Sequence, residues 1–168
     1  MIGSVILLGL VTAERAAEPV IAARNTRRLL AQGGVEHAAG HYPLLLVMHV
    51  AWLAGLWLLA WDRPMNLAWL GVFLVLQVLR IWVLATLGRR WTTRVITVPG
   101  ETLVRRGPYR LLKHPNYAVV VGEIAVLPLV FGLGWFALAF SLANAVALFI
   151  RIRAEDRALA PLRAPTAP

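Results

Sequence analysis

The apolar block at residues 117–150 constrains the fold of this chain more than any other stretch. It contains one acidic residue, Glu123, and no cation. At 1.5 Å per residue, a single helix of this length would be about 51 Å long, well beyond a bilayer core of ~30 Å. Because Pro128 and a nearby pair of glycines would interrupt such a helix, we expect a helical hairpin with arms at about 115–131 and 134–158.

The rest of the chain is also strongly apolar. Hydrophobic residues make up 60% of its 168 residues, and the mean hydropathy is +0.70. These values predict an all-α integral membrane protein. The net charge of +9 would suit nucleic acid in a soluble protein. Here we assign the cations to membrane-flanking loops and anionic headgroups, and we expect no nucleic-acid partner. Cysteine is absent, which excludes disulfides and thiolate metal sites.

The N-terminal segment predicts a first membrane helix. Its apolar run, residues 1–13, has no cation before it, which favours a membrane helix over a secretory signal peptide. We expect the helix to continue past Glu14 and Glu18 and to bend at Pro19. These two carboxylates and Asn25 fall within about 40° of one helical stripe. A helix lying on the membrane surface, with this stripe in water, is the alternative.

Two further apolar segments, residues 44–61 and 65–87, predict the second and third spans. Residues 26–42 before them predict a polar loop or a short surface helix. Residues 88–113 predict a basic connector outside the membrane, and within it residues 94–98 alternate in a way that permits a short extended piece.

These spans contain the polar side chains of His49, Gln77 and Arg80. His49 is the only strongly polar residue of the second span. A single histidine in a membrane helix is more often hydrogen-bonded between helices than catalytic. Gln77 and Arg80 lie three apart on the third span. A charge there costs roughly 2.5–3.5 kcal/mol, so Arg80 needs a partner or a wet cavity, unless its side chain snorkels to the interface.

The distribution of cations predicts the topology. They concentrate before the second span, in the connector and after the last span, whereas the opposite loops carry only Arg63. The positive-inside rule then gives five spans in the cell membrane, with the N-terminus outside and the C-terminus cytoplasmic. We expect one membrane domain over residues 1–168: three helices to residue 87, a C-terminal core at 88–159 and a flexible tail at 160–168.

The densest chemistry lies where the connector enters the hairpin, at residues 105–117. Gly107-Pro108 is a turn signal, and Pro115 suits the first turn of a helix. His114, placed before a proline, is a natural N-cap position. Polar residues thus gather where a helix enters the membrane.

Both arms of the hairpin carry polar residues at helical spacing. Asn144, Arg151 and Glu155 share one stripe of the last helix, and Asn116 and Glu123 are seven residues apart on the preceding helix. If the two stripes face each other, they close a polar pocket at the membrane surface. Two simpler interpretations remain open. Arg151 and Glu155 could form an i,i+4 pair worth a few tenths of a kcal/mol, and the polar residues could join helices without further function.

The motifs of the connector and the hairpin, and their order along the chain, resemble those of the isoprenylcysteine carboxyl methyltransferase family. The pattern of that family is Arg-His-Pro-x-Tyr, then a hydrophobic stretch, then Glu-Glu-x-x-Leu. The matching residues are Gly107-x-Tyr109, His114-Pro115-Asn116-Tyr117 and Glu155-Asp156-x-x-Leu159. The likeness covers about residues 94–159. It is closer to the bacterial branch, which includes alkylresorcinol-type O-methyltransferases, and there it extends back through His41-Tyr42-Pro43 and the third span. Lys113 and Asp156 depart from the pattern, replacing an arginine and a second glutamate.

The resemblance implies a methyltransferase that uses S-adenosylmethionine and encloses it between the connector and the two C-terminal helices. The expected cofactor-binding residues are Leu103, Val104, Tyr109, His114, Pro115, Asn116, Tyr117 and Glu155. Arg151 and Glu155 are the expected catalytic residues. The expected acceptor is a carboxylate or phenol of a lipophilic prenyl or alkyl molecule, reached from the cytoplasmic membrane face. Arg151, Glu123, Arg80 and Asn144 are our candidates for binding it.

The residue types agree with this chemistry. Glu155 suits the ammonium of the donor, the helix start at His114 suits its carboxylate, and Tyr109 and Tyr117 suit adenine or the sulfonium. Four scattered histidines do not suggest a metal site. The alternatives are a non-enzymatic transporter or assembly protein, and a lipid-modifying enzyme of the same fold that uses a nicotinamide.

Overall fold

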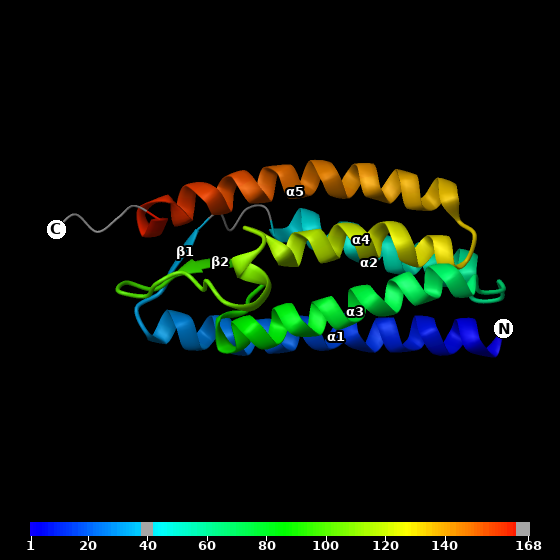
Figure 1. The fold of residues 1–168 in the computed structure, drawn as a ribbon, viewed down its shortest axis with the longest axis horizontal. Helices are drawn as coiled ribbons and strands as arrows, with labels where there is room; N and C mark the ends of the chain where they lie inside the picture. Colours follow the sequence, from blue (N-terminus) through cyan, green and yellow to red (C-terminus); the bar gives the residue numbers. More distant parts are fainter. Residues whose placement is uncertain (38–41, 164–168) are drawn as a thin grey trace.

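The computed structural model describes residues 1–37 and 42–163 as a bundle of five α-helices capped at one end by the connector (Figure 1). The α-helices are α1 (Ile2–Ala31), α2 (Tyr42–Ala60), α3 (Leu67–Leu87), α4 (Pro115–Val130) and α5 (Gly134–Arg163). The connector contains the 3-10 helices η2 (Gly88–Arg90) and η3 (Gly107–Arg110) and the strand β2 (Val95–Thr97), which pairs with β1 (Val35–His37).

Within the described residues, three helices are long and apolar enough to cross a membrane: Pro43–Ala60, Leu67–Arg90 and Gly134–Ala160. This supports a multi-pass membrane protein. Of the remaining two, α4 is apolar but has only 16 residues, and the 30 residues of α1 include several charged ones. The prediction of five spans is therefore supported for three helices.

The predicted hairpin is confirmed in α4 and α5, which pack along each other. Gly132 occupies the turn between them with φ +70°, a conformation that glycine adopts without steric cost. The last helix is longer than expected, because alanine, leucine, arginine and glutamate are strong helix formers and carry it to Arg163. Residues 160–163 of the predicted tail are thus helical, and residues 164–168 lie outside the described part of the chain.

The prediction for residues 26–42 is wrong in two places. Helix α1 continues to Ala31, and Val35–His37 forms the strand β1, which pairs antiparallel with β2 in the register Val35↔Thr97. The extended piece expected in the connector is confirmed as β2. His41 lies outside the described residues.

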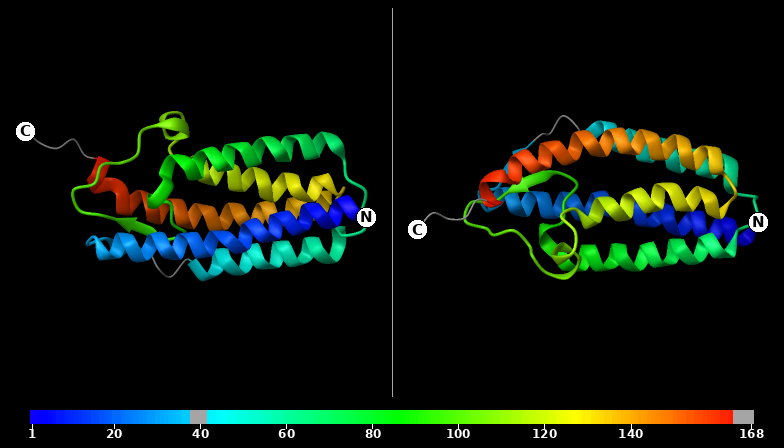
Figure 2. Two further views of the ribbon diagram at one scale, coloured as in Figure 1. Left: turned by 90° about the horizontal axis from the view of Figure 1, so that it is seen from below. Right: turned by 45° about the horizontal axis from the view of Figure 1, so that its top comes forward.

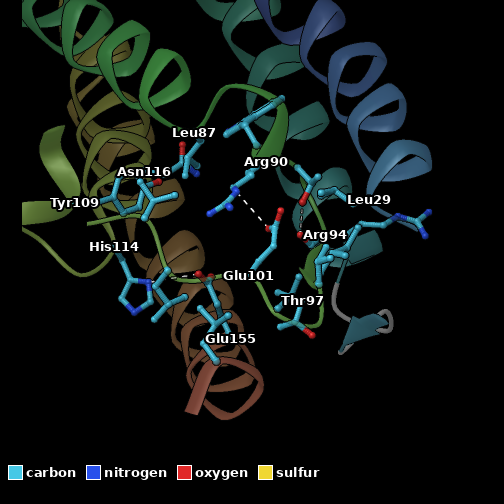
Figure 3. A pocket seen from close by; sticks show the side chains of 18 of the residues that line it. Leu29, Leu87, Arg90, Arg94, Thr97, Glu101, Tyr109, His114, Asn116 and Glu155 are labelled. Carbon is cyan, nitrogen blue, oxygen red and sulfur yellow. Dashed lines mark hydrogen bonds and ion pairs between the residues drawn. The ribbon is translucent and has the colours of Figure 1, made fainter. Parts of the chain in front are cut away.

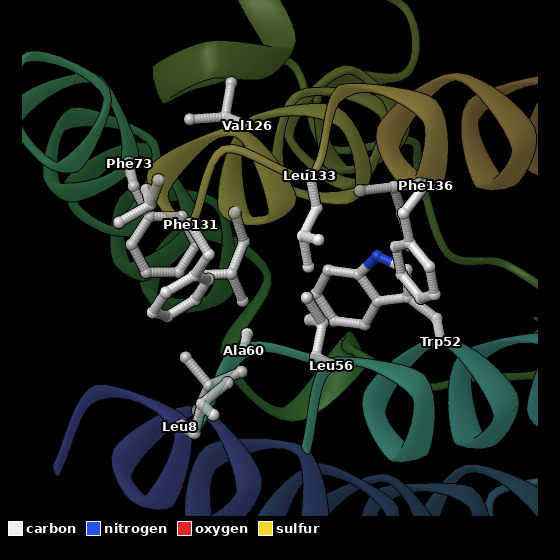
Figure 4. Packing of buried hydrophobic residues seen from close by; sticks show 13 residues of the cluster. Leu8, Trp52, Leu56, Ala60, Phe73, Val126, Phe131, Leu133 and Phe136 are labelled. Atoms are coloured by element: carbon white, nitrogen blue, oxygen red, sulfur yellow. The ribbon is translucent and has the colours of Figure 1, made fainter. Parts of the chain in front are cut away.

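The apolar core joins all five helices at the end of the bundle opposite the connector (Figure 4). Trp52 of α2 and Phe73 of α3 are almost fully buried there. A Cβ at Gly55 of α2 would lie 2.7 Å from the ring of Phe136 on α5. Gly55 therefore permits the close approach of α2 and α5 that small residues provide between membrane helices.

A buried ion cluster joins α1, α3 and α4 around Arg80, which is only 3% exposed. Its guanidinium contacts Glu14 at 2.9 Å, Glu123 at 2.7 Å and also Glu18. Glu123 further accepts hydrogen bonds from Arg15 at 2.7 Å and from Gln77 at 3.2 Å. Arg80 therefore has protein partners and does not snorkel.

The same contacts argue against the alternative for α1, a surface helix with its polar stripe in water. A surface helix would leave Glu14 and Glu18 in water, whereas both pair with Arg80. Asn25 is also buried, and its amide donates to the carbonyl oxygen of Trp91 at 2.7 Å. In the described part of the chain, the His49 ring bonds the Leu45 carbonyl of its own helix at 2.8 Å, whereas we expected a bond between helices.

Candidate functional site

A cavity of about 520 Å³ lies where the connector covers the ends of α3, α4 and α5 (Figure 3). This size is within the range of about 300–1,000 Å³ that is usual for small-molecule and cofactor sites. Eight of the predicted site residues line it: Leu103, Val104, Tyr109, His114, Asn116, Tyr117, Arg151 and Glu155. The motifs from the connector and both hairpin arms therefore meet at one cavity.

Local backbone geometry brings the connector to this cavity. Gly107 has φ +55°, and a Cβ there would lie 2.7 Å from Oγ1 of Thr86. Only glycine allows both this conformation and the close packing of η3 on the end of α3. Pro115 then begins α4, and His114 takes the predicted N-cap position. The His114 ring makes no capping hydrogen bond and points toward α5 instead.

A chain of hydrogen bonds connects α4, α5 and the connector. The Tyr117 hydroxyl donates to the Glu155 carboxylate. Arg151 donates from Nε to the Tyr117 oxygen at 2.9 Å and from Nη2 to the Thr93 carbonyl at 2.7 Å. This network fixes three polar side chains on the cavity wall before any ligand is bound.

His114 completes the charged side of the cavity. Its Nδ1 lies 3.7 Å from Oε1 of Glu155 and its Nε2 lies 3.1 Å from Oδ1 of Asp156, while its ring stacks on Tyr117. The contact with Glu155 raises the pKa of His114, against the opposing effect of burial, and Asp156 adds to the increase. At Tyr109, burial and then the Glu155 charge raise the pKa of the phenol, which keeps it neutral.

The two residues that depart from the family pattern contact each other. Nζ of Lys113 lies 3.0 Å from Oδ1 of Asp156, on the rim next to His114. Both replacements keep the sign of the charge, and the ion pair shows that they are also compatible with each other in space.

Four predicted residues do not line the cavity. Arg80 and Glu123 belong to the buried ion cluster between α1, α3 and α4. Asn144 is 1% exposed on α5, about 10 Å along the helix from Arg151. Pro115 is buried at the start of α4. The two polar stripes thus converge only at their connector ends, through Asn116, Arg151 and Glu155.

The cavity also has polar residues that the sequence did not indicate. Arg90 forms an ion pair with Glu101 at 3.3 Å and donates to the Thr102 carbonyl at 2.8 Å (Figure 3). Arg94 and Thr97 also line the cavity. These residues belong to a three-residue 3-10 helix, to irregular chain or to a three-residue strand, and all of these are too short for helical spacing to indicate which side chains meet.

Comparisons with known proteins support the family resemblance that the sequence motifs indicated. The model of the isoprenylcysteine carboxyl methyltransferase (ICMT) family matches residues 69–161, which include α4, the connector and most of α3 and α5. A protein of Bacillus subtilis (strain 168), "Uncharacterized protein YpbQ", is 40% identical over 159 residues, covering 92% of this chain and 95% of that protein. No solved structure matches.

The family match covers more than half of the chain, and it contains every predicted site residue that lines the cavity. The chain therefore belongs to the isoprenylcysteine carboxyl methyltransferase family, a family of S-adenosylmethionine-dependent methyltransferases.

Proposed function

We propose that this protein transfers a methyl group from S-adenosylmethionine to a carboxylate or phenol oxygen of a lipophilic acceptor. The observation that carries the proposal is the arrangement around Tyr117. This residue lies between a charged cavity under the connector and a shallow apolar groove between α4 and α5.

The residues of the cavity suit the charged groups of the donor. Glu155 offers a carboxylate for its ammonium, and its Tyr117 and His114 contacts hold that carboxylate in place. The raised pKa of His114 favours an imidazolium, which together with the start of α4 suits the donor carboxylate. Leu103, Val104 and Tyr109 provide the apolar and aromatic surface that an adenine needs.

When bound, S-adenosylmethionine supplies an electrophilic methyl group on a sulfonium. The protein then has to align an anionic acceptor oxygen with that methyl group and exclude water. Arg151 is held rigidly by Tyr117 and by the Thr93 carbonyl. Its charge favours a carboxylate, or the ionised form of a phenol, on the same wall. We assign donor binding to Glu155 and acceptor binding to Arg151.

The groove suits the lipophilic part of the acceptor. It measures about 390 Å³ and is lined by apolar residues of α4 and α5, among them Val121, Leu148 and Phe149, and by His114 and Tyr117. Val121 and Phe149 are exposed, so they face lipid in a membrane. An alkyl or prenyl chain could therefore remain in the bilayer while its polar head reaches Tyr117. On the positive-inside rule, we place this site at the cytoplasmic face.

The test uses purified full-length protein in lipid vesicles with methyl-labelled donor. One reaction contains an alkylresorcinol and the other a prenylated cysteine thioether. The proposal predicts label in at least one lipid product. Mild alkali releases methanol from a carboxyl ester but not from an aryl ether, so it distinguishes the two acceptor classes. Donor binding without transfer to either acceptor would contradict the proposed acceptor class, and absence of donor binding would contradict the proposed site.

A further inference from the structure

The segment at residues 105–113, which we term the basic loop, exposes two leucines outside every helix that could span the membrane. Leu111 is 80% exposed and Leu112 is 52% exposed. They follow η3 and precede α4. Exposed leucines on α2, α3 or α5 are expected in a protein that faces lipid. In an extramembrane connector, two adjacent exposed leucines are instead a small apolar surface of the kind found at interaction sites.

The basic loop also carries a dense positive charge. Arg105, Arg106, Arg110 and Lys113 are all exposed, and no acidic residue occurs between Thr102 and Lys113. Lys113 pairs with Asp156, which leaves the three arginines as the main positive surface. Leucines flanked by cations are typical of segments that lie in a membrane interface.

The fold holds the basic loop at the level of that interface. Arg106 donates to the Thr86 carbonyl at the end of α3 at 3.3 Å, and Gly107 lies against Thr86 and the indole of Trp82. Trp82 is 45% exposed and lies about one turn from the end of α3, where interfacial tryptophans are enriched. Figure 2 (left) shows η3 projecting to the side of the bundle next to this helix end.

We infer that the basic loop is a lipid-binding surface: its arginines take the phosphates of anionic lipids, and Leu111 and Leu112 enter the boundary between headgroups and acyl chains. Charge complementarity selects an anionic bilayer over a zwitterionic one. The exposed leucines favour a bilayer over a purely polar partner such as nucleic acid.

This surface is continuous with the candidate site. Arg105, Tyr109 and Lys113 belong to the loop and also line the cavity. Lipid contact would therefore steady one wall of the cavity. The inference itself concerns only where the loop lies and does not depend on the methyl-transfer reaction.

The chain contains no cysteine, so a single introduced cysteine can carry a spin label whose depth is measured by electron paramagnetic resonance. The variant is Leu111→Cys in the full-length protein, reconstituted in vesicles with and without phosphatidylglycerol. Pro99→Cys, on the exposed turn of the connector, provides the aqueous reference. Val75→Cys, exposed on α3, provides the lipid reference.

In anionic vesicles, we expect the label at position 111 to be accessible to oxygen and protected from a polar nickel chelate, as the label at position 75 is. The label at position 111 should be less protected from nickel in vesicles of phosphatidylcholine alone, at high salt, and in the double variant Arg105→Gln, Arg110→Gln. Two results would overturn the inference. One is a label at position 111 as open to nickel as that at position 99 in both kinds of vesicle. The other is protection that arises only when RNA or a soluble protein is added.

Discussion

The ammonium of Lys113 lies 3.0 Å from a carboxylate oxygen of Asp156, which joins the end of the connector to the last helix. Both positions differ from the usual family residues, arginine and glutamate. The pair is partly exposed, with 56% of the Lys113 side chain and 32% of the Asp156 side chain accessible.

A double-mutant cycle of Lys113→Ala and Asp156→Ala should therefore give a small coupling free energy, below about 1 kcal/mol. We expect Asp156→Ala to lower the stability more than Lys113→Ala, because Asp156 also contacts His114. Unfolding in detergent measures both. A coupling of several kcal/mol, or the reverse order of the single variants, would contradict this view of the pair.

The ion cluster around Arg80 predicts a large effect on stability. Arg80→Gln leaves Glu14, Glu18 and Glu123 without their shared cation, and breaking a buried pair typically costs about 3–5 kcal/mol. Arg157→Gln, on the exposed face of α5, is the matched control and should change little. We expect donor affinity per folded molecule to stay at the parent level, because Arg80 does not line the cavity. A loss of affinity in stably folded protein would show that Arg80 has a role in the site.

The raised pKa of His114 predicts a pH dependence of stability. In the unfolded chain the imidazole titrates near 6.5, whereas in the folded protein Glu155 and Asp156 hold its proton to higher pH. The stabilising attraction is fully present below about pH 6.5 and is lost as the pH rises through the folded pKa. The difference in Tm between the parent and His114→Gln should therefore become smaller as the pH rises from about 6.5 through the folded pKa of His114. A difference that grows with pH would contradict the assigned contacts.

Two glycines of the connector allow a controlled test of the packing of η3. Both have positive φ, +55° for Gly107 and +79° for Gly100, so alanine is strained at either position. Only at Gly107 would the new Cβ also meet Thr86. We expect Gly107→Ala to cost about 1–3 kcal/mol more than Gly100→Ala, the usual cost of overpacking. Equal effects in denaturant unfolding would mean that η3 does not pack on α3 in this way.

Local sequence signals predicted the hairpin and the start of its first arm, because helix length and helix ends depend on residues that are close in sequence. The length of the apolar block and its glycines required the hairpin, and Pro115 marked the start of α4. The strand β1 has only three residues, and its pairing with β2 joins positions about sixty residues apart. No local pattern identifies such a strand, because the partner supplies most of its stabilisation.

The candidate site was predictable where motifs specify single residues. His114, Tyr117 and Glu155 come together as the resemblance implies. Helical spacing alone misled at Glu123, because a seven-residue interval defines a face of α4 but not which neighbour that face meets. The neighbours are α1 and α3, and the need of Arg80 for a partner, visible in the sequence, is met there.

In the proposed function, Glu155 binds the ammonium of the methyl donor. The most direct measurement is a calorimetric titration of S-adenosylmethionine into the parent protein, Glu155→Gln and the control Asp62→Asn, whose carboxylate lies in the exposed loop at the opposite end of the bundle. A charge-assisted hydrogen bond of about 1.5–3 kcal/mol corresponds to a roughly 10- to 150-fold loss of affinity in Glu155→Gln. The parent and Asp62→Asn should bind alike. If folded Glu155→Gln binds the donor as tightly as the parent, Glu155 does not bind the donor ammonium.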